Sequence, residues 1–240
     1  MASAATQQQS NVISINSASL RTHSSPRPGM MNYMTLNPMI VRAAEQIAGC
    51  SLSTPLDPRV HYRNLPTLTE QEADLILHYL HRTLPRQYHC PAPAPGLNIG
   101  LEYAACLIDT EGYCGATSFH TPGRKHPGHR LMVCISQNHL QTLQHGASII
   151  GANHGRKGPY KVKRNLTQNK QCYTLNYNNA HALHALARVY PYLIRKREIA
   201  IMMLRLFIEG RLWEHPGSRG VHPQVRTIRC KHTAKIKRML

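Results

Sequence analysis

The stretch of sequence that decides the fold runs from Ala104 to Gly112 and reads Ala-Ala-Cys-Leu-Ile-Asp-Thr-Glu-Gly. Small residues come first, two apolar residues follow, and two acids precede a glycine where a helix is expected to end. A carboxylate at the C-terminal end of a helix is disfavoured by about 0.3–1 kcal/mol, because that end of the helix dipole is negative. Asp109 and Glu111 therefore need a positive neighbour, and a divalent cation is the simplest candidate.

The chain as a whole is strongly basic. Its 240 residues include 29 Lys and Arg against 11 Asp and Glu, which gives a formal net charge of +18. Between Tyr113 and Arg197 there is no acid and there are thirteen Lys or Arg residues. A compact protein with this charge repels itself unless it binds a polyanion. We therefore expect nucleic acid as the partner, with an anionic membrane surface as the second candidate.

Membrane insertion and structural metal binding are both disfavoured. A membrane-spanning helix needs about 18 apolar residues, and the run from Ile199 to Ile208 is short and interrupted by Arg205. The pairs His126-x-x-His129 and His181-x-x-His184 have the spacing of metal ligands, but a zinc site needs four ligands and the sequence has no Cys-x-x-Cys pair. The seven scattered cysteines favour reduced thiols in an intracellular compartment.

The N-terminal part of the chain divides at about residue 54. Residues 1–54 are rich in Ser, Ala, Gln, Asn and Met. This composition is similar to a mitochondrial or chloroplast presequence, and a disordered extension produces the same statistics, so both interpretations stay open. In residues 55–96 we expect a helix from Thr67 or Thr69, each of which begins a capping box. A Pro-rich linker, Cys90–Gly96, ends this segment.

Residues 97–210 alternate helices and strands. We expect helices over 101–110, 138–150, 180–189 and 195–207, and strands over 113–121, 130–136, 160–164 and 171–177. Each strand has one apolar face to cover the helices, while the other face can enter a major groove and contact bases and phosphates. The candidate nucleic-acid-binding residues are Thr117, Thr121, Arg124, Lys125, Arg130, Lys161, Lys163, Arg164, Thr174 and Asn176.

Residues 211–240 form a basic tail. No acid follows Glu214, and Pro223 to Met239 predicts a short basic helix. A solvated surface is one interpretation of this helix. We favour a phosphate-binding tail, because the segment holds several cations and no acid to neutralise them.

Two separated blocks resemble the LAGLIDADG homing endonuclease family. Ala104–Gly112 aligns with the motif that names the family, and Tyr190–Ala200 resembles its second block, a Pro-aromatic-Leu followed by a basic residue and an Ala-bearing helix. Residues Ile135–Asn138 are similar to the strand-to-helix junction of the family. The resemblance covers residues 97–210 and implies an α+β fold with the order αββαββα. Its motif helices pair at a two-fold axis through small residues, here Ala104 and Ala105.

The resemblance also implies an activity. Because the chain has only one motif, a homodimer would bind a long, roughly palindromic site on double-stranded DNA. The implied function is that of a Mg²⁺-dependent, site-specific endonuclease of the intron-homing type. The chain departs from the usual motif at three positions. Cys106 replaces Gly, Thr110 replaces Ala or Gly, and Glu111 replaces Asp but keeps the carboxylate.

The family's functional residues carry over to five positions. Glu111 would be the catalytic acid and a metal ligand, and the carbonyl of Thr110 a second ligand. Lys196 and Gln137 would lie beside the active-site water, and Asp109 would be a structural cap. The rival interpretation is a non-cleaving RNA-binding protein of the same fold, such as an intron maturase or a ribosome-associated factor. A DNA-binding regulator without catalysis is a third.

Overall fold

The chain folds into mixed helix and sheet, which the computed structural model describes over residues 33–57, 59–84, 100–123, 125–151, 160–161, 172–214 and 220–240. The helices are α1 (Tyr33–Ala48), α2 (Glu70–Thr83), α3 (Leu101–Glu111), α4 (Leu140–Ile150), α5 (Ala180–Val189), the 3-10 helix η2 (Tyr190–Tyr192), α6 (Arg197–Glu209) and α7 (Pro223–Arg238). The strands are β1 (Gly112–Phe119), β2 (Gly128–Gln137), β3 (Tyr160–Lys161) and β4 (Tyr173–Asn178). From α3 to α5 their order is αββαββα, which confirms the predicted α+β fold.

The strands form one antiparallel sheet in the order β1-β2-β4-β3. Ile135 of β2 pairs with Gly112 on one side and with Leu175 on the other. The apolar residues Leu131, Val133 and Ile135 are fully buried on what we call the inner face. The alternating residues, among them the exposed Arg130, lie on the outer face. The predicted division of β2 into an apolar and a polar face is therefore confirmed.

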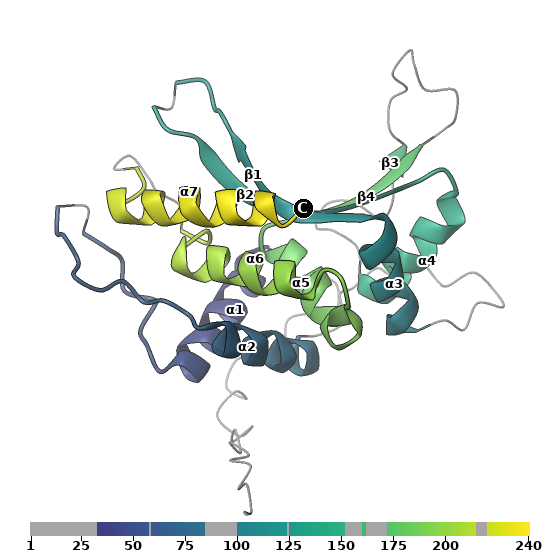
Figure 1. The fold of residues 1–240 in the computed structure, drawn as a ribbon, viewed down its shortest axis with the longest axis horizontal. Helices are drawn as coiled ribbons and strands as arrows, with labels where there is room; N and C mark the ends of the chain where they lie inside the picture. Colours follow the sequence, from purple (N-terminus) through teal and green to yellow (C-terminus); the bar gives the residue numbers. More distant parts are fainter. Residues whose placement is uncertain are drawn as a thin grey trace, which may run out of the picture.

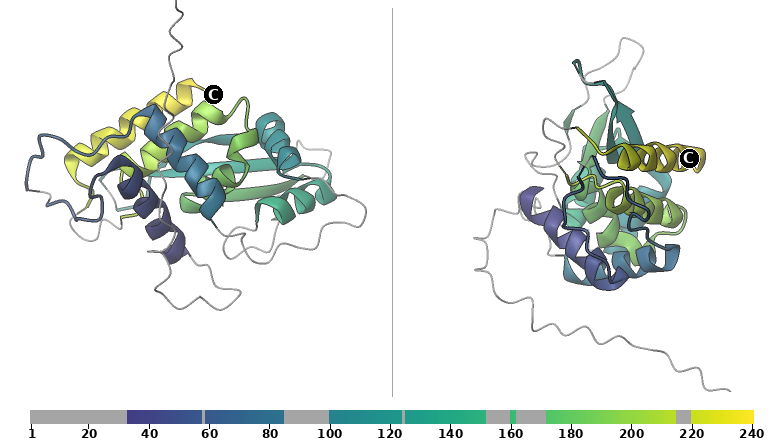
Figure 2. Two further views of the ribbon diagram at one scale, coloured as in Figure 1. Left: turned by 90° about the horizontal axis from the view of Figure 1, so that it is seen from below. Right: turned by 90° about the vertical axis from the view of Figure 1, so that its left-hand side faces the viewer.

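The helices lie beneath the sheet in two layers (Figure 1). Helices α3, α4, α5 and α6 contact the strands, and α1 and α2 pack below α5 and α6. Strands β1 and β2 rise on one side of Figure 1 and β3 and β4 on the other, so the outer face of the sheet is concave. Helix α7 lies along β1 and α6, and Figure 2 shows it from two further sides.

Helix α1 corrects the expectation that all of residues 1–54 form a disordered or presequence-like extension. Leu36, Ile40 and Ala44 recur every four residues, so they share one helix face and are fully buried against the rest of the core. Residues 1–32 and the linker at 90–96 lie outside the described residues. None of the helices in the described ranges is long and apolar enough to cross a membrane.

Helix α2 begins at the second of the two predicted capping boxes. The backbone N–H of Glu72 donates to the Thr69 hydroxyl over 3.1 Å, and the N–H of Thr69 donates to the Glu72 carboxylate over 2.7 Å. At its other end His81 Nδ1 lies 2.9 Å from the carbonyl of Arg188 and covers the C-terminus of α5. Helix α2 therefore packs against α5 and α6 and shares their hydrophobic core.

A buried carboxylate joins α6, α7 and the segment before α2. Glu209 accepts hydrogen bonds from Arg205 Nε at 2.9 Å and from the backbone N–H of Leu68 at 3.1 Å, and its other oxygen lies 2.6 Å from His232 Nε2. Burial raises the pKa of Glu209, but the hydrogen bonds from His232 and Arg205 outweigh it and hold that pKa below its usual value. The charged form is therefore the stable form in the folded chain.

We expect Glu209→Gln to lower the free energy of unfolding by about 3 kcal/mol, because the change leaves Arg205 and His232 without their carboxylate partner. Folding lowers the pKa of Glu209, so its stabilising effect is present above the usual carboxyl pKa of about 4.3 and is lost as the pH falls below it. Urea unfolding from about pH 6 to 3 should show wild type losing more stability than the variant. Glu198→Gln, an exposed site on the same helix, is the control; an equal effect there would contradict the prediction.

Candidate active site at the end of helix α3

Helix α3 passes directly into β1 at Gly112. The backbone N–H of Gly112 closes the last turn by donating to the carbonyl of Ile108. A Cβ at position 112 would lie 2.5 Å from that carbonyl oxygen, so no other residue allows this approach. Glu111, the preceding residue, is exposed. The glycine thus sets the end of α3 and leaves the Glu111 carboxylate at the surface.

Asp109 has a different environment from Glu111. Its side chain is only 7% exposed. One oxygen accepts from the backbone N–H groups of Ile194 at 2.7 Å and Arg195 at 3.2 Å, and the other accepts from Lys196 at 2.9 Å. Lys196 is the N-cap of α6, so a negative charge here also lies at the positive end of that helix dipole. Asp109 therefore holds the entrance to α6 against the end of α3.

Lys196 forms a second contact between the two sequence blocks, 190–200 and 104–112. Its Nζ donates to the carbonyl of Gly112 over 2.6 Å, which places the ammonium group one residue from Glu111. Beneath it lies Cys114, which is fully buried on β1. Burial raises the pKa of the Cys114 thiol to about 12, so the thiol stays neutral. Glu111 is the residue immediately before Gly112, whose carbonyl this ammonium group contacts.

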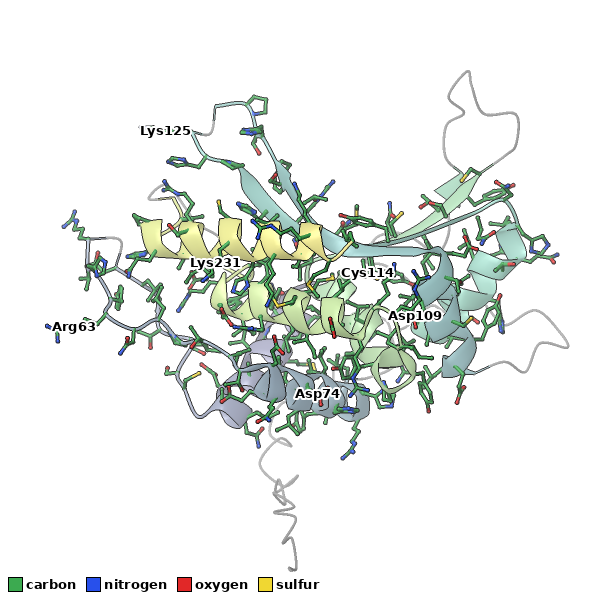
Figure 3. The ribbon with its side chains drawn as sticks, viewed as in Figure 1. Arg63, Asp74, Asp109, Cys114, Lys125 and Lys231 are labelled. Atoms are coloured by element: carbon green, nitrogen blue, oxygen red, sulfur yellow. The ribbon has the colours of Figure 1, made fainter. Side chains whose placement is uncertain are left out.

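Gln137 lies at the same end of the sheet. It is the last residue of β2, two positions beyond Ile135, which pairs with Gly112. Its side chain is half-buried. The fold therefore gathers Glu111, Lys196 and Gln137 from three separate parts of the chain around the junction of α3 and β1. Figure 3 shows Asp109 beside this junction and Cys114 on the strand that follows it.

The oxygen ligands at this junction fit a magnesium ion only in part. Within the described residues no cluster of three or more His, Cys, Asp or Glu side chains could hold a metal. Asp109 is saturated by backbone donors, which leaves Glu111 and the carbonyl of Thr110 as candidate ligands. Mg²⁺ commonly takes one or two carboxylates and completes its shell with water and substrate phosphate. One chain therefore supplies only part of the ligand set of a magnesium site.

The predicted nucleic-acid-binding residues are distributed over the outer face and the loops. Thr117 and Arg130 lie opposite each other on the outer face, and Lys125 is exposed at the tip of the β1–β2 hairpin (Figure 3). Thr121 follows the end of β1, which stops at Phe119. Arg124, Lys163 and Arg164 lie outside the described residues, as does the side chain of Lys161.

Thr174 and Asn176 lie on the outer face of β4. Asn176 is half-buried. Thr174 is only 5% exposed, and its hydroxyl lies 3.1 Å from Ser136 Oγ and 3.2 Å from Cys134 Sγ. The structure thus corrects the prediction that Thr174 is available to nucleic acid, because its neighbours on β2 already occupy the hydroxyl. Of these three residues, Ser136 is the one exposed to solvent.

The two predicted dimer residues are also corrected. Ala104 and Ala105 are 0% exposed within the single chain, because α3 packs them against neighbouring elements of its own domain. The face that α3 exposes carries Cys106 and Thr110. Beside its last turn stands Ile194, an apolar side chain that is 85% exposed. The sequence already showed that Cys106 and Thr110 occupy motif positions that usually hold small residues. Nothing in the sequence indicated that Ile194 would be exposed beside them.

Helix α7 supports the β1–β2 hairpin. His129 Nδ1 lies 3.0 Å from the Thr233 hydroxyl, and Arg226 contacts His126 Nε2 over 2.7 Å. Of the two histidine pairs with metal-like spacing, His126 and His129 thus each contact α7 separately. The basic tail was predicted from its composition, but its position along the hairpin depends on contacts about a hundred residues apart in the sequence.

Comparisons with known proteins give a likeness of fold. No protein-family model matches the chain, and no curated protein matches it. Among solved structures the chain is similar to the homing endonuclease I-CvuI in complex with the I-CreI target and 2 mM Mg, with the DNA not cleaved: 17% identity, TM-score 0.45, 58% of this chain and 81% of that one. I-CvuI with its own target and 2 mM Ca gives a TM-score of 0.46 at the same identity and coverage.

The two acids of α3 should behave differently when neutralised. We expect Asp109→Asn to lower the free energy of unfolding by about 3 kcal/mol, because an amide cannot accept from all three backbone donors as well as a carboxylate does. Glu111→Gln should change it by less than about 0.5 kcal/mol, since that side chain is exposed. Urea unfolding measures both. Equal effects would mean that Asp109 is not the structural acid.

Proposed function

We propose that the chain is a Mg²⁺-dependent, site-specific double-strand DNA endonuclease of the intron-homing type that acts as a homodimer. The observation that carries this proposal is the junction of α3 and β1. There an exposed carboxylate, Glu111, stands one residue from the carbonyl that holds the Lys196 ammonium. The concave outer face of the sheet leads to this junction. The chain as a whole carries a net charge of +18, which attracts a polyanion.

Each residue of the junction has a distinct part in phosphodiester hydrolysis. Glu111 and the Thr110 carbonyl would hold a magnesium ion, which would supply activation of water and neutralisation of negative charge. Lys196 is held rigidly through Gly112 and stabilises negative charge that develops on the phosphate. Gln137 orients water through its amide. Asp109 acts through the backbone of Ile194 to Lys196 and keeps Lys196 in place.

The case for a homodimer rests on the incomplete ligand set of one chain. Among the residues that the structure describes, only Glu111 offers a free carboxylate at the junction, since Asp109 is occupied by backbone donors. A two-fold axis beside the exposed side of α3 brings a second Glu111 to the same place. The narrow side chains of Cys106 and Thr110 let two helices approach closely, and Ile194 adds an apolar contact.

We expect the protein to cut long duplex DNA at discrete sites when Mg²⁺ is present. Glu111→Gln should lower the cleavage rate by on the order of 10³-fold while leaving DNA affinity nearly unchanged, because the carboxylate is needed for chemistry. Sequencing of ends from a long-target library detects the cuts, and a gel-shift assay measures affinity. The control is Glu198→Gln, which neutralises an exposed acid two residues beyond Lys196. Cleavage by Glu111→Gln at the wild-type rate would exclude this mechanism.

A non-cleaving RNA-binding protein is the second candidate. The basic helix α7 and the packed helices α1 and α2 lie outside the αββαββα core and favour it, because they add surface that DNA cleavage does not need. A splicing or ribosome-assembly assay separates the two functions. Full activity of Glu111→Ala in that assay, together with tighter binding of structured RNA than of duplex DNA, supports the second candidate.

The dimer has its own test. We expect Ile194→Asp to weaken self-association by on the order of tenfold or more, because a charge would be buried at the apolar contact. Analytical ultracentrifugation over a range of concentrations measures the dissociation constant. Leu75→Asp is the matched control, since Leu75 is also an exposed apolar residue but lies on α2.

Crosslinking tests the same contact without disturbing it. A short bifunctional maleimide should join Cys106 to the partner's Cys106. Cys106→Ser should remove this product and Cys230→Ser should not, although both cysteines are exposed. A monomeric wild type, or crosslinking only through Cys230, would contradict the proposed two-fold axis.

A further inference from the structure

We propose that Arg130 reads a guanine in the major groove of each half of the DNA target. The inference rests on the proposed function, because it requires the outer face to lie against duplex DNA. Arg130 stands near the start of β2, opposite Thr117 of β1 and before β2 begins to pair with β4 at Met132. It thus belongs to a two-stranded ribbon, an element narrow enough to enter a major groove.

The Arg130 side chain is held in one orientation by its neighbours on β1. Its Nε donates to the Thr117 hydroxyl over 3.2 Å. Its guanidinium carbon lies 5.7 Å from the centre of the Phe119 ring, within the range of a cation–π contact. Two contacts of different kinds, one polar and one aromatic, therefore restrain the guanidinium group before any ligand binds.

Gly128 makes this arrangement possible. A Cβ at position 128 would lie 2.5 Å from Cζ of Phe119, so the ring lies directly over the glycine. Phe119 is nonetheless 41% exposed, which is unusual for a phenylalanine that has a core beneath its strand. A ring lying against the strand on the outer face supports Arg130 and leaves room above it for a base pair.

The remaining donors of Arg130 match one base. With Nε bound to Thr117, the two terminal amino groups remain as a fork of donors. Among the described residues no carboxylate forms an ion pair with Arg130. In the major groove guanine presents two acceptors, O6 and N7, at the spacing of such a fork, and no other base does so. A pre-oriented arginine loses little side-chain entropy on binding, so its selectivity is retained.

Lys125 provides the contrast. It is exposed in the loop at the tip of the same hairpin, and among the described residues no hydrogen bond or ion pair holds its ammonium group. Such a cation binds phosphate without regard to sequence. The two residues carry the same charge on the same hairpin, so they form a matched pair in which Arg130 selects sequence and Lys125 adds affinity.

The test selects bound duplexes from a random-sequence DNA library, using the full chain without divalent metal. Wild type should enrich a two-fold symmetric site with one guanine in each half that depends on Arg130. Arg130→Gln should remove the preference at that position only, lowering affinity for the guanine site by about 5- to 150-fold, and should favour adenine. Thr117→Val should weaken the preference without changing the preferred base. Circular dichroism confirms that the variants fold.

Lys125→Gln should lower affinity equally for all sequences and reduce the slope of log affinity against log salt by about 0.9 for each subunit, or about 1.8 for the dimer. If Arg130→Gln behaves in the same uniform way, Arg130 contacts phosphate and the inference is overturned while the proposed function stands. If wild type enriches sites but no position depends on Arg130, the inference also fails alone. If wild type enriches no duplex sequence, both fail together.

Discussion

The structure of the functional end of this chain depends on one carboxylate. Asp109 accepts from three consecutive backbone N–H groups that lie more than eighty residues later in the sequence. Hydrogen bonds to a charged acceptor are among the stronger ones in proteins, and a largely buried site strengthens them further. Without this acceptor the segment before α6 would have three donors and no partner. The positions of Lys196 and Ile194, and so the active site and the dimer contact, follow from this interaction.

The outer face of the sheet stays basic because acids such as Glu209 and Asp74 lie among the helices beneath it. Two carboxylates beneath the sheet are paired: the buried Glu209 with Arg205 and His232, and the half-buried Asp74 with Arg197. Burial and the hydrogen bonds from Tyr190 and Arg197 act in opposite directions on Asp74, and the hydrogen bonds prevail, so its pKa lies below the usual value. These pairs join the helices beneath the sheet and leave the outer face free of carboxylates in the described strands. The positive charge there is available for a ligand.

The order of the elements could be predicted because it depends on local pattern. In strand β2 apolar and polar residues alternate, and the capping box of Thr69 and Glu72 marks the start of α2. What the sequence could not reveal is which distant segments meet. The small residues Ala104 and Ala105 suit a close helix contact equally well inside one chain or between two, and only the packed structure shows that the contact is internal. Helix α1 escaped prediction because a polar, Met-rich composition outweighed its short apolar repeat.

The start of α6 shows how such a distant contact changes a local prediction. Propensity alone extends the helix back to residue 195, but the structure begins it at Arg197. The difference arises because Asp109 draws the preceding N–H groups toward itself, so Lys196 becomes the cap. This also changes the electrostatic argument for a cation at the end of α3. Asp109 is already compensated by the positive end of α6, so it needs no metal. The requirement falls on Glu111 alone, whose remaining positive neighbour is Lys196. A single exposed carboxylate is a weak cation site, and that weakness is the physical reason why a second chain and a phosphate should be needed to complete it.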